Sequence, residues 1–372
     1  MLTLAEKQGR LAIQNMSRYI SQGLVDLAYG IKNLARRATG QPLKPRWLWF
    51  EVTDRCNSRC VHCAIWRKEP TKDALTPDEI GKTFSDPLFS DVRCILNAGG
   101  EPTLRQDFNE ILLAEHEALP KASLTLSTNG LLPERAINTI EFAIQHNINL
   151  GVGISLDGVG ENHDLIRGVK GNFEKVDKLS HKVIALREKY GKEKISPIFG
   201  FTLSDQTLPF LEEVRTYAKN LGIELLVQWY SQSPFYDNIG KNLTTTDGSM
   251  VKTVQSLPYP ILRELWLKWL AGKSIRFHCF AMDTFCALHC NGDIVPCLSL
   301  WDTKAGNVRE SSPTALWSDS KAKSVRETVK SCPGCLNAWG SRWSFESSFY
   351  PYLLFFLRHP RMLAEMVKSD RA

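Results

Sequence analysis

The chain has 372 residues, a net charge of +6 and 43% apolar residues. This length accommodates a full barrel or two domains, and the apolar content supports a large buried core. The positive charge is too modest to require a nucleic-acid partner, and we predict none. No apolar run reaches the roughly 18 residues that a membrane-spanning helix needs.

The ten cysteines are the most informative part of the composition. No signal peptide precedes them, so we expect a reducing, cytoplasmic location. Cysteines there bind metals or carry out redox chemistry rather than form disulfides.

Residues 1–44 are predicted to form an amphipathic helical extension. Apolar side chains recur at steps of three and four, which marks one face of a helix: Ile13, Met16, Ile20, Leu24, Leu27, Ile31 and Leu34. Lys32 and Arg36 lie largely off that face. Two interpretations stay open, namely a helix packed on the protein body and a basic helix that lies on a membrane or holds a partner.

From Trp47 onward, short apolar runs alternate with helical patterns. The runs predict strands at 47–53, 93–98, 123–128, 149–156, 196–203 and 224–230. The patterns between them predict helices at 108–118, 133–145, 173–190 and 208–221, and Thr76-Pro-Asp-Glu79 is a capping box that opens a further helix. This alternation predicts right-handed βαβ units and a parallel sheet.

Three cysteines directly follow the first predicted strand. Cys56, Cys60 and Cys63 have the spacing C-x3-C-x2-C. Three thiolates are one too few for a closed zinc site, and they suit a cubane iron–sulfur cluster with one open iron. A zinc knuckle or a chance grouping is the alternative.

This cysteine run resembles the signature of the radical S-adenosylmethionine (radical SAM) superfamily. The resemblance implies an α/β fold, a partial (β/α)6 TIM-like barrel over residues 45–257. It also implies a [4Fe–4S] cluster whose open iron binds S-adenosyl-L-methionine (SAM). Reductive cleavage of SAM would give a 5′-deoxyadenosyl radical that takes hydrogen from a substrate carbon.

Further motifs of the same family follow the next strands. They are Gly99-Gly100-Glu101-Pro102, Ser127-Thr-Asn129-Gly, and Ser155-Leu-Asp157-Gly with His163-Asp and Arg167-Gly. The resemblance implies that the SAM-binding residues are His62, Gly99, Gly100, Glu101, Asn129, Ser155 and Arg167. The alternative is that Asp157-Gly158 is a plain turn and that Arg167 and His62 are surface residues.

Residues 231–257 form a long polar segment rich in Pro, Gly, Asn and Thr. We expect a loop without secondary structure, which is either a cover over the substrate or disordered.

A second cysteine set lies in residues 258–340, and its order resembles the C-terminal SPASM/twitch domain. The resemblance implies one auxiliary [4Fe–4S] cluster with the ligands Cys279, Cys297, Cys332 and Cys335. A structural zinc site is the alternative. Cys286 and Cys290 depart from the pattern, so a ligand role for either stays open, and Cys94 is expected in the core.

Residues 341–372 are predicted to form a helical tail rich in aromatic and basic side chains. It either packs on the barrel or lies at a membrane interface, so peripheral membrane contact stays open.

The first functional hypothesis is a radical SAM oxidoreductase, similar to dehydrogenases, that acts on a small molecule such as a sugar or a lipid-linked group. A reducing partner such as flavodoxin or ferredoxin would supply electrons, and the auxiliary cluster would accept an electron from the substrate or anchor it. A maturase of ribosomal peptides or proteins is the second hypothesis, and a zinc-stabilised binding protein is the third. The sequence does not name a catalytic acid or base.

Overall fold

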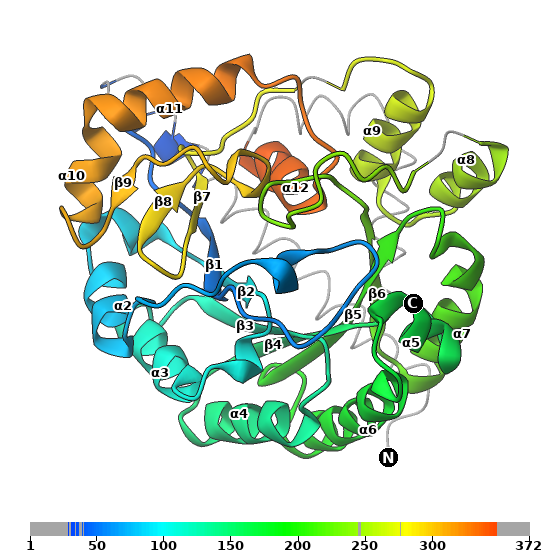
Figure 1. Ribbon diagram of the computed structural model, residues 1–372. Helices are drawn as coiled ribbons and strands as arrows, with labels where there is room; N and C mark the ends of the chain where they lie inside the picture. Colours follow the sequence, from blue (N-terminus) through cyan, green and yellow to red (C-terminus); the bar gives the residue numbers. More distant parts are fainter. Residues whose placement is uncertain are drawn as a thin grey trace, which may run out of the picture.

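The computed structural model describes residues 29, 31–33, 35–36, 39, 41–244, 247–275 and 277–347. One nine-stranded sheet, in the order β6-β5-β4-β3-β2-β1-β7-β8-β9, forms its frame. Figure 1 shows this sheet curving around the centre of the molecule, with helices on its outer surface.

Strands β1 to β6 form a parallel array in which each strand pairs with the next along the chain. Their bounds are β1 Trp47–Thr53, β2 Cys94–Gly99, β3 Ser123–Thr128, β4 Leu150–Ser155, β5 Ile195–Leu203 and β6 Glu224–Trp229. Every predicted strand is present with each end within one residue, and the predicted partial barrel is confirmed.

Helices connect these strands and cover the outside of the sheet. They are α2 Pro77–Phe84, α3 Phe108–Ala118, α4 Pro133–Gln145, α5 Glu161–Arg167, α6 Asn172–Tyr190 and α7 Leu211–Leu221. The capping box of Thr76 and Glu79 opens α2 as predicted. The helix expected at 208–221 begins instead with a 3₁₀ turn, Leu208–Phe210, before α7.

Alternation along β1 explains how the sheet separates core from cavity. Leu48, Phe50 and Val52 are fully buried and point to the helices, where Phe50 meets Phe84 edge to face at 5.8 Å between ring centroids. Because successive side chains of a strand point to opposite faces, Trp49 points to the inside of the barrel.

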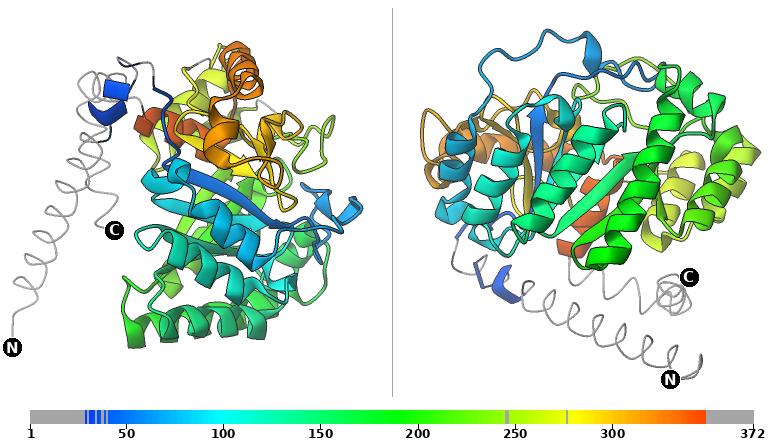
Figure 2. Two further views of the ribbon diagram at one scale, coloured as in Figure 1. Left: turned by 90° about the vertical axis from the view of Figure 1, so that its left-hand side faces the viewer. Right: turned by 90° about the horizontal axis from the view of Figure 1, so that it is seen from below.

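The C-terminal strands extend the barrel sheet rather than form a separate one. The C-terminal elements are α8 Gly248–Gln255, α9 Pro260–Leu270, β7 Phe285–Leu288, β8 Asp293–Val295, β9 Gly306–Asn307, α10 Pro313–Ser318, α11 Ser320–Ser331 and α12 Ala338–Ser347. Strand β7 pairs in parallel with β1, and β8 and β9 follow as antiparallel strands. Figure 2 shows β7 to β9, α10 and α11 gathered beside β1. The predicted boundaries at 45, 258 and 341 stay predictions.

The polar segment 231–257 differs from its prediction. The segment was expected to lack secondary structure, but it contains α8. The N-cap of this helix, Asp247, accepts a hydrogen bond from the Met250 amide at 2.9 Å. Ser233 and Asn238 are buried, and Asn238 Nδ2 donates to the His62 carbonyl at 3.0 Å. Buried polar contacts therefore hold the part of the segment around these residues against the cysteine loop.

Only the end of the predicted N-terminal helix is among the described residues. There Ile31, expected on the packed face, is 58% exposed, whereas Tyr29 and Asn33 are buried, so the packed face was predicted wrongly at this point. Lys32 and Arg36 both form ion pairs with Asp91. The apolar positions from Ile13 to Leu27, together with Leu34 and the tail from residue 348, lie outside the described residues.

Within the described ranges, no helix is long and apolar enough to cross a membrane.

Candidate active site

The carboxyl ends of the parallel strands surround a cavity of about 230 Å³. Parallel sheets place ligands at this end. Cys56, Cys60 and Cys63 line the cavity. The other residues predicted for this rim line it as well: His62, Gly99, Gly100, Glu101, Asn129, Ser155 and Arg167. The structure therefore brings every residue predicted for the SAM site together, although their roles stay predictions.

Hydrogen-bond donors point at the thiols of this first set. Ser58 Oγ lies 3.1 Å from Cys60 Sγ, and Arg167 Nη1 donates to the same sulfur at 3.5 Å. The Ser58 amide donates to Cys56 Sγ at 3.5 Å, and Asn129 Nδ2 does so at 3.9 Å. Such donors stabilise negative charge on sulfur.

Burial has the opposite effect on the free thiols. It raises the pKa of Cys56 to about 11 and that of Cys63 to about 12, so both hold their protons at pH 7 without a metal. Metal binding replaces those protons, because thiolates are the ligands. Three thiols around one cavity, with donors aimed at two of them, fit an iron–sulfur cluster. Across the described residues, no group of three or more His, Cys, Asp or Glu could hold a single metal ion.

Gly99 and Gly100 are needed for a reason that the sequence did not reveal. The close neighbours of both glycines belong to the chain itself. A Cβ on Gly100 would lie 1.9 Å from the Arg55 carbonyl oxygen, and one on Gly99, at φ +122°, 2.2 Å from that of Thr53. These glycines let the end of β2 cross directly beside the start of the cysteine loop.

Glu101 is buried, and donors of the chain occupy its carboxylate. Oε1 accepts from Thr103 Oγ1 at 2.7 Å and from Thr128 Oγ1 at 2.8 Å, and Oε2 accepts from the Asn129 amide at 2.6 Å. Burial nevertheless raises the pKa of Glu101 above its usual range. The carboxylate joins the ends of β2 and β3, and this places Asn129 against the cavity.

Arg167 is buried, so the alternative of a surface residue is wrong. Its Nη2 lies 2.8 Å from Asp157 Oδ2, and Asp157 also accepts from the Thr202 amide at 2.8 Å. Asp157 is therefore part of a buried ion pair and not of a plain turn. Burial alone would lower the pKa of Arg167, but Asp157 and Cys60 outweigh it and raise this pKa. The guanidinium is thus shared between a carboxylate and a sulfur before any ligand binds.

His62 is also buried, which excludes the surface alternative for it. Its Nε2 lies 3.9 Å from Asp157 Oδ2, while its Nδ1 has no hydrogen-bond partner among the described residues. Burial lowers the pKa of His62 to about 4, so the ring is neutral at pH 7. A neutral ring with an unpaired nitrogen at the cavity agrees with the predicted role of His62 in binding SAM, which stays a prediction.

The second cysteine set is also brought together. Burial, followed by repulsion from Cys279 and Cys332, raises the pKa of Cys335 to about 12. Burial also raises the pKa of Cys297, with Cys335 and Cys279 as further causes. These mutual effects place the four predicted auxiliary ligands beside one another, and the ligand role itself stays a prediction.

The other cysteines lie apart from that set. Cys286 sits in β7 opposite Leu48 of β1 and is 1% exposed. The Cys290 amide donates to Glu51 Oε2 at 3.3 Å, on the β1 side of the sheet. Cys94 begins β2. It was expected to be buried in the core, but it is only half-buried.

Aromatic side chains complete the cavity, and sequence reasoning missed them. Trp49, Phe235, Tyr236 and Trp339 line it, and Phe235 meets Trp49 edge to face at 6.0 Å. The inward position of Trp49 on β1 was a usable signal. Phe235 and Tyr236 stand in a segment that is otherwise polar, and Trp339 comes soon after the last cysteine, so neither position carries a pattern of its own.

The fold and the two cysteine sets define the class of an iron–sulfur protein built on a partial α/β barrel. The family profile of the radical SAM superfamily matches residues 50–206, and that of the iron–sulfur cluster-binding SPASM domain matches residues 279–336. The chain belongs to the radical SAM superfamily and carries a C-terminal SPASM domain. These domains imply a SAM-binding [4Fe–4S] cluster and an auxiliary [4Fe–4S] cluster.

Several relatives share part of the chain. Fe-coproporphyrin III synthase of Methanosarcina barkeri is 38% identical over 134 residues, 35% of this chain and 32% of the relative. Pre-heme d1 synthase of Dinoroseobacter shibae is 28% identical over 233 residues, 62% of this chain and 53% of the relative. The subtilosin biosynthesis protein AlbA of Bacillus subtilis is 33% identical over 127 residues, which are 33% of this chain and 27% of the relative. The match therefore spans about half of these relatives or less.

Solved structures show the same fold. SuiB of Streptococcus suis, bound to the precursor peptide SuiA, superposes with a TM-score of 0.60 at 19% identity, covering 78% of this chain and 68% of SuiB. The structure of anSMEcpe with bound AdoMet superposes with a TM-score of 0.58 at 18% identity, covering 86% of this chain and 98% of anSMEcpe.

Proposed function

We propose that this protein is a radical SAM enzyme that oxidises a small organic molecule in the barrel cavity. The observation that carries the proposal is the cavity itself, in which the thiols of the first cysteine set face an aromatic wall. When bound, the cluster and SAM supply a 5′-deoxyadenosyl radical, and the difficult chemistry belongs to them.

The chain's own residues hold and shield this site. Cys56, Cys60 and Cys63 hold the cluster, and Ser58 and Arg167 fix Cys60 from two sides. The polar segment supplies Phe235 and Tyr236 to the cavity wall. Lys68 holds it there by donating to the Pro234 and Phe235 carbonyls at 2.8 and 3.0 Å. Exclusion of water protects a reactive intermediate from side reactions.

The cavity wall indicates the kind of substrate. Among its described lining residues, the one carboxylate, Glu101, and the one permanent cation, Arg167, are both engaged by the chain. Neutral polar groups lie between the aromatic rings: Ser155, Thr202, Gln228 and Asn337. An uncharged, hydroxyl-bearing group with an apolar face suits this wall, because unpaired buried charge is costly. A sugar or a sugar-like part of a lipid-linked molecule has this character.

The auxiliary cysteine set lies next to the same cavity. Asn337 and Trp339 follow Cys335 closely in the chain and line the cavity wall. This neighbourhood supports a role of the auxiliary cluster as electron acceptor or substrate anchor. Hydrogen abstraction removes one electron and one proton from the substrate, and transfer of one further electron with loss of a proton gives a two-electron oxidation.

Modification of a ribosomal peptide is the second candidate. The observation in its favour is the likeness to AlbA, which is named for bacteriocin biosynthesis. A peptide would have to place one side chain in the aromatic cavity while the remainder lies outside.

Anaerobic purification, followed by iron, sulfide and 5′-deoxyadenosine analysis with dithionite and SAM, tests the proposal. We expect about eight irons per chain, four for each cubane, and 5′-deoxyadenosine. Zinc without iron, or no SAM cleavage by fully loaded protein, would contradict it. Deuterium transfer into 5′-deoxyadenosine from a deuterated sugar rather than a deuterated peptide would favour the first candidate over the second.

A further inference from the structure

The loop that carries the first cysteine set is a thin partition between two cavities. Cys60 and Cys63 line the barrel cavity, and both also line a second cavity of about 500 Å³ on the other side of the loop. The second cavity is formed by the loop itself, the short helical turn Ile65–Arg67, Gln206, and the segment from Asp237 to Lys241. A cluster bound here therefore has one face toward the substrate and one toward this outer cavity.

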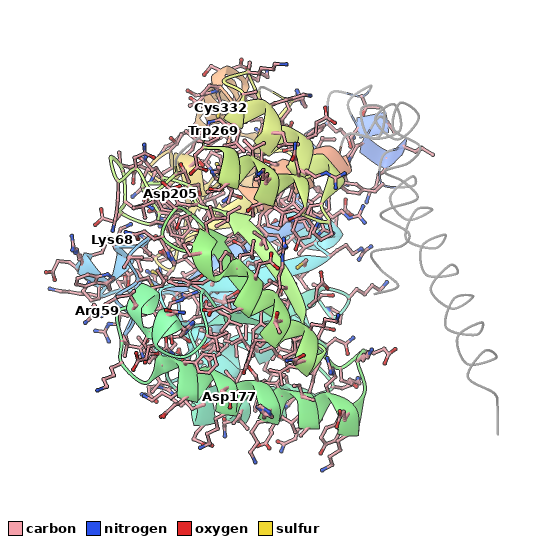
Figure 3. The ribbon with its side chains drawn as sticks, turned by 90° about the vertical axis from the view of Figure 1, so that its right-hand side faces the viewer. Arg59, Lys68, Asp177, Asp205, Trp269 and Cys332 are labelled. Atoms are coloured by element: carbon pink, nitrogen blue, oxygen red, sulfur yellow. The ribbon has the colours of Figure 1, made fainter. Side chains whose placement is uncertain are left out.

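The outer cavity is predominantly positive. Its described charged lining residues are the cations Arg59, Arg67 and Lys241 and the carboxylate Asp237, three positive charges against one negative. All four side chains belong to exposed residues. Figure 3 shows Arg59 at the edge of the molecule where Lys68 also lies, well apart from Cys332 of the auxiliary set.

Contacts with the loop hold two of these cations in place. Arg59 Nη1 donates to the Ser58 carbonyl at 2.9 Å and to the Cys56 carbonyl at 3.4 Å. Lys241 Nζ donates to the Val61 carbonyl. The positive charge is thus fixed on the backbone that carries the thiols, and less side-chain entropy is lost when a partner binds.

An aromatic and apolar centre accompanies the charge. Trp66 lies between two guanidinium groups, with Arg59 and Arg67 each 4.7 Å from its ring centroid. Its indole Nε1 has no hydrogen-bond partner among the described residues. Ile239, which lines the same cavity, is 67% exposed. Trp and Arg are among the residue types that contribute most of the binding energy at protein–protein interfaces.

We infer that this outer surface, made of Arg59, Trp66, Arg67, Ile239 and Lys241, docks an acidic one-electron carrier protein that reduces the cluster. Charge complementarity selects the partner, because fixed positive charge attracts and orients an acidic surface. Proximity to the cluster follows from Cys60 and Cys63, which line this side. In the transfer, the carrier is oxidised by one electron and the cluster is reduced by one electron. The inference rests on the proposed function in that it needs a cluster on these thiols.

Charge reversal tests the surface. Arg67→Glu is the suitable variant, because Arg67 contacts the Trp66 ring and no side-chain hydrogen bond ties it to the loop. Lys121→Glu is the matched control, since exposed Lys121 precedes β3 and lies at the opposite end of the strands. The probe is a purified acidic flavodoxin, pre-reduced, and the readout is the rate at which it bleaches the cluster absorbance.

We expect Arg67→Glu to slow reduction by flavodoxin about three- to tenfold at low ionic strength, with the difference shrinking as salt is added. Arg67→Gln should fall between, and Lys121→Glu should match the parent protein. Reduction by dithionite should be equal in all four proteins. Equal flavodoxin rates for Arg67→Glu and Lys121→Glu, or a rate insensitive to salt, would overturn the inference.

Titration calorimetry of flavodoxin binding separates this inference from the proposed function. The expected result is an affinity at least about threefold lower for Arg67→Glu than for Lys121→Glu, as reversal of a charge at an interface weakens attraction. Equal affinities would overturn the docking surface even in protein without a cluster. Absence of iron together with a normal Arg67 effect would contradict the proposed function but leave the surface standing.

Discussion

The two cysteine sets of this chain occupy contrasting surroundings. The first set lies on a loop with a buried ion pair beside it, and a guanidinium nitrogen is 3.5 Å from Cys60 Sγ. In the auxiliary set, Cys279 and Cys297 pack against an aromatic cluster that includes Phe280 and Trp343. A positive charge beside a cluster favours the extra electron of the reduced state. This contrast supports the proposal that the first set is reduced and binds SAM and that the second set has a supporting role.

The largest expected effect separates the two sets directly. Cys60→Ala removes a thiol that Ser58 and Arg167 hold, so the first cluster should be lost and 5′-deoxyadenosine formation abolished. Cys335→Ala should lose about four irons, one cubane, and keep the cleavage of SAM. Iron analysis and product chromatography check both variants. Full iron content in Cys335→Ala would show that the auxiliary assignment is wrong.

Removal of the buried countercharge should have the next largest effect. Asp157 is fully buried and pairs with Arg167, so Asp157→Asn leaves a cation without its partner. We expect the free energy of unfolding to fall by about 3–5 kcal/mol, as measured by denaturant titration. Lys178→Gln, which breaks the exposed pair of Lys178 with Glu134, is the control and should cost at most about 1 kcal/mol. Similar losses in both variants would show that the buried Asp157–Arg167 pair contributes no more to stability than an exposed pair.

Substitution of Gly168, a glycine beside the cysteine loop, should have a smaller effect on stability, and Gly171 provides the matched control. Gly168 and Gly171 both have positive φ, +67° and +74°, but only at Gly168 would a Cβ meet the chain, 2.4 Å from the Arg59 carbonyl oxygen. Both alanine variants pay for the backbone conformation, and Gly168→Ala should lose about 1–3 kcal/mol more because the loop must shift. It should also lower iron retention in the first set. Equal stability of the two variants would contradict this packing.

The smallest effect concerns a contact between the C-terminal elements and the barrel helix α2. Arg309, just after β9, forms hydrogen bonds with both carboxylate oxygens of Glu79 in α2, at 2.6 and 2.8 Å. The hydrogen bond from Arg309 is the main reason why the pKa of Glu79 is lowered to about 2. A lowered carboxyl pKa stabilises the fold above its ordinary value of about 4.3, and this is lost as the pH falls toward 2.

We therefore expect Arg309→Gln to lower the free energy of unfolding by less than about 1 kcal/mol at pH 7, because the pair is largely exposed. The difference from the parent protein should vanish near pH 2. Lys330→Gln is the control, because the pair of Lys330 with Glu327 lies within α11 and its loss leaves the contact between Arg309 and Glu79 intact. A constant Arg309→Gln effect from pH 7 to pH 2 would refute this account.

Much of the fold could be predicted because its signals are local. Strands buried on both faces are mainly apolar runs, as in Trp47–Thr53, where five of the seven residues are apolar. A capping box needs only residues three apart, as in Thr76 and Glu79. The addition of β7 to the edge of β1 could not be predicted, because the four residues Phe285–Leu288 fit many partners and tertiary packing selects one.

The site shows the same limit. The spacing of Cys56, Cys60 and Cys63 indicates a cluster because the ligands are close in sequence. The pairing of Arg167 with Asp157, and the contact of Gly100 with Arg55, depend on where separate strands end in space. For this reason the residues of the rim were found from motifs, whereas their contacts, and the aromatic wall with Trp339, came only from the structure.

Electron paramagnetic resonance of the two cysteine variants tests the central claim most directly. Reduced Cys335→Ala retains only the first cluster, and addition of SAM should change its spectrum, because SAM binds the open iron. Reduced Cys60→Ala retains only the auxiliary cluster, and SAM should leave its spectrum unchanged. A spectral change in Cys60→Ala, or none in Cys335→Ala, would contradict the assignment of SAM binding to the first cysteine set.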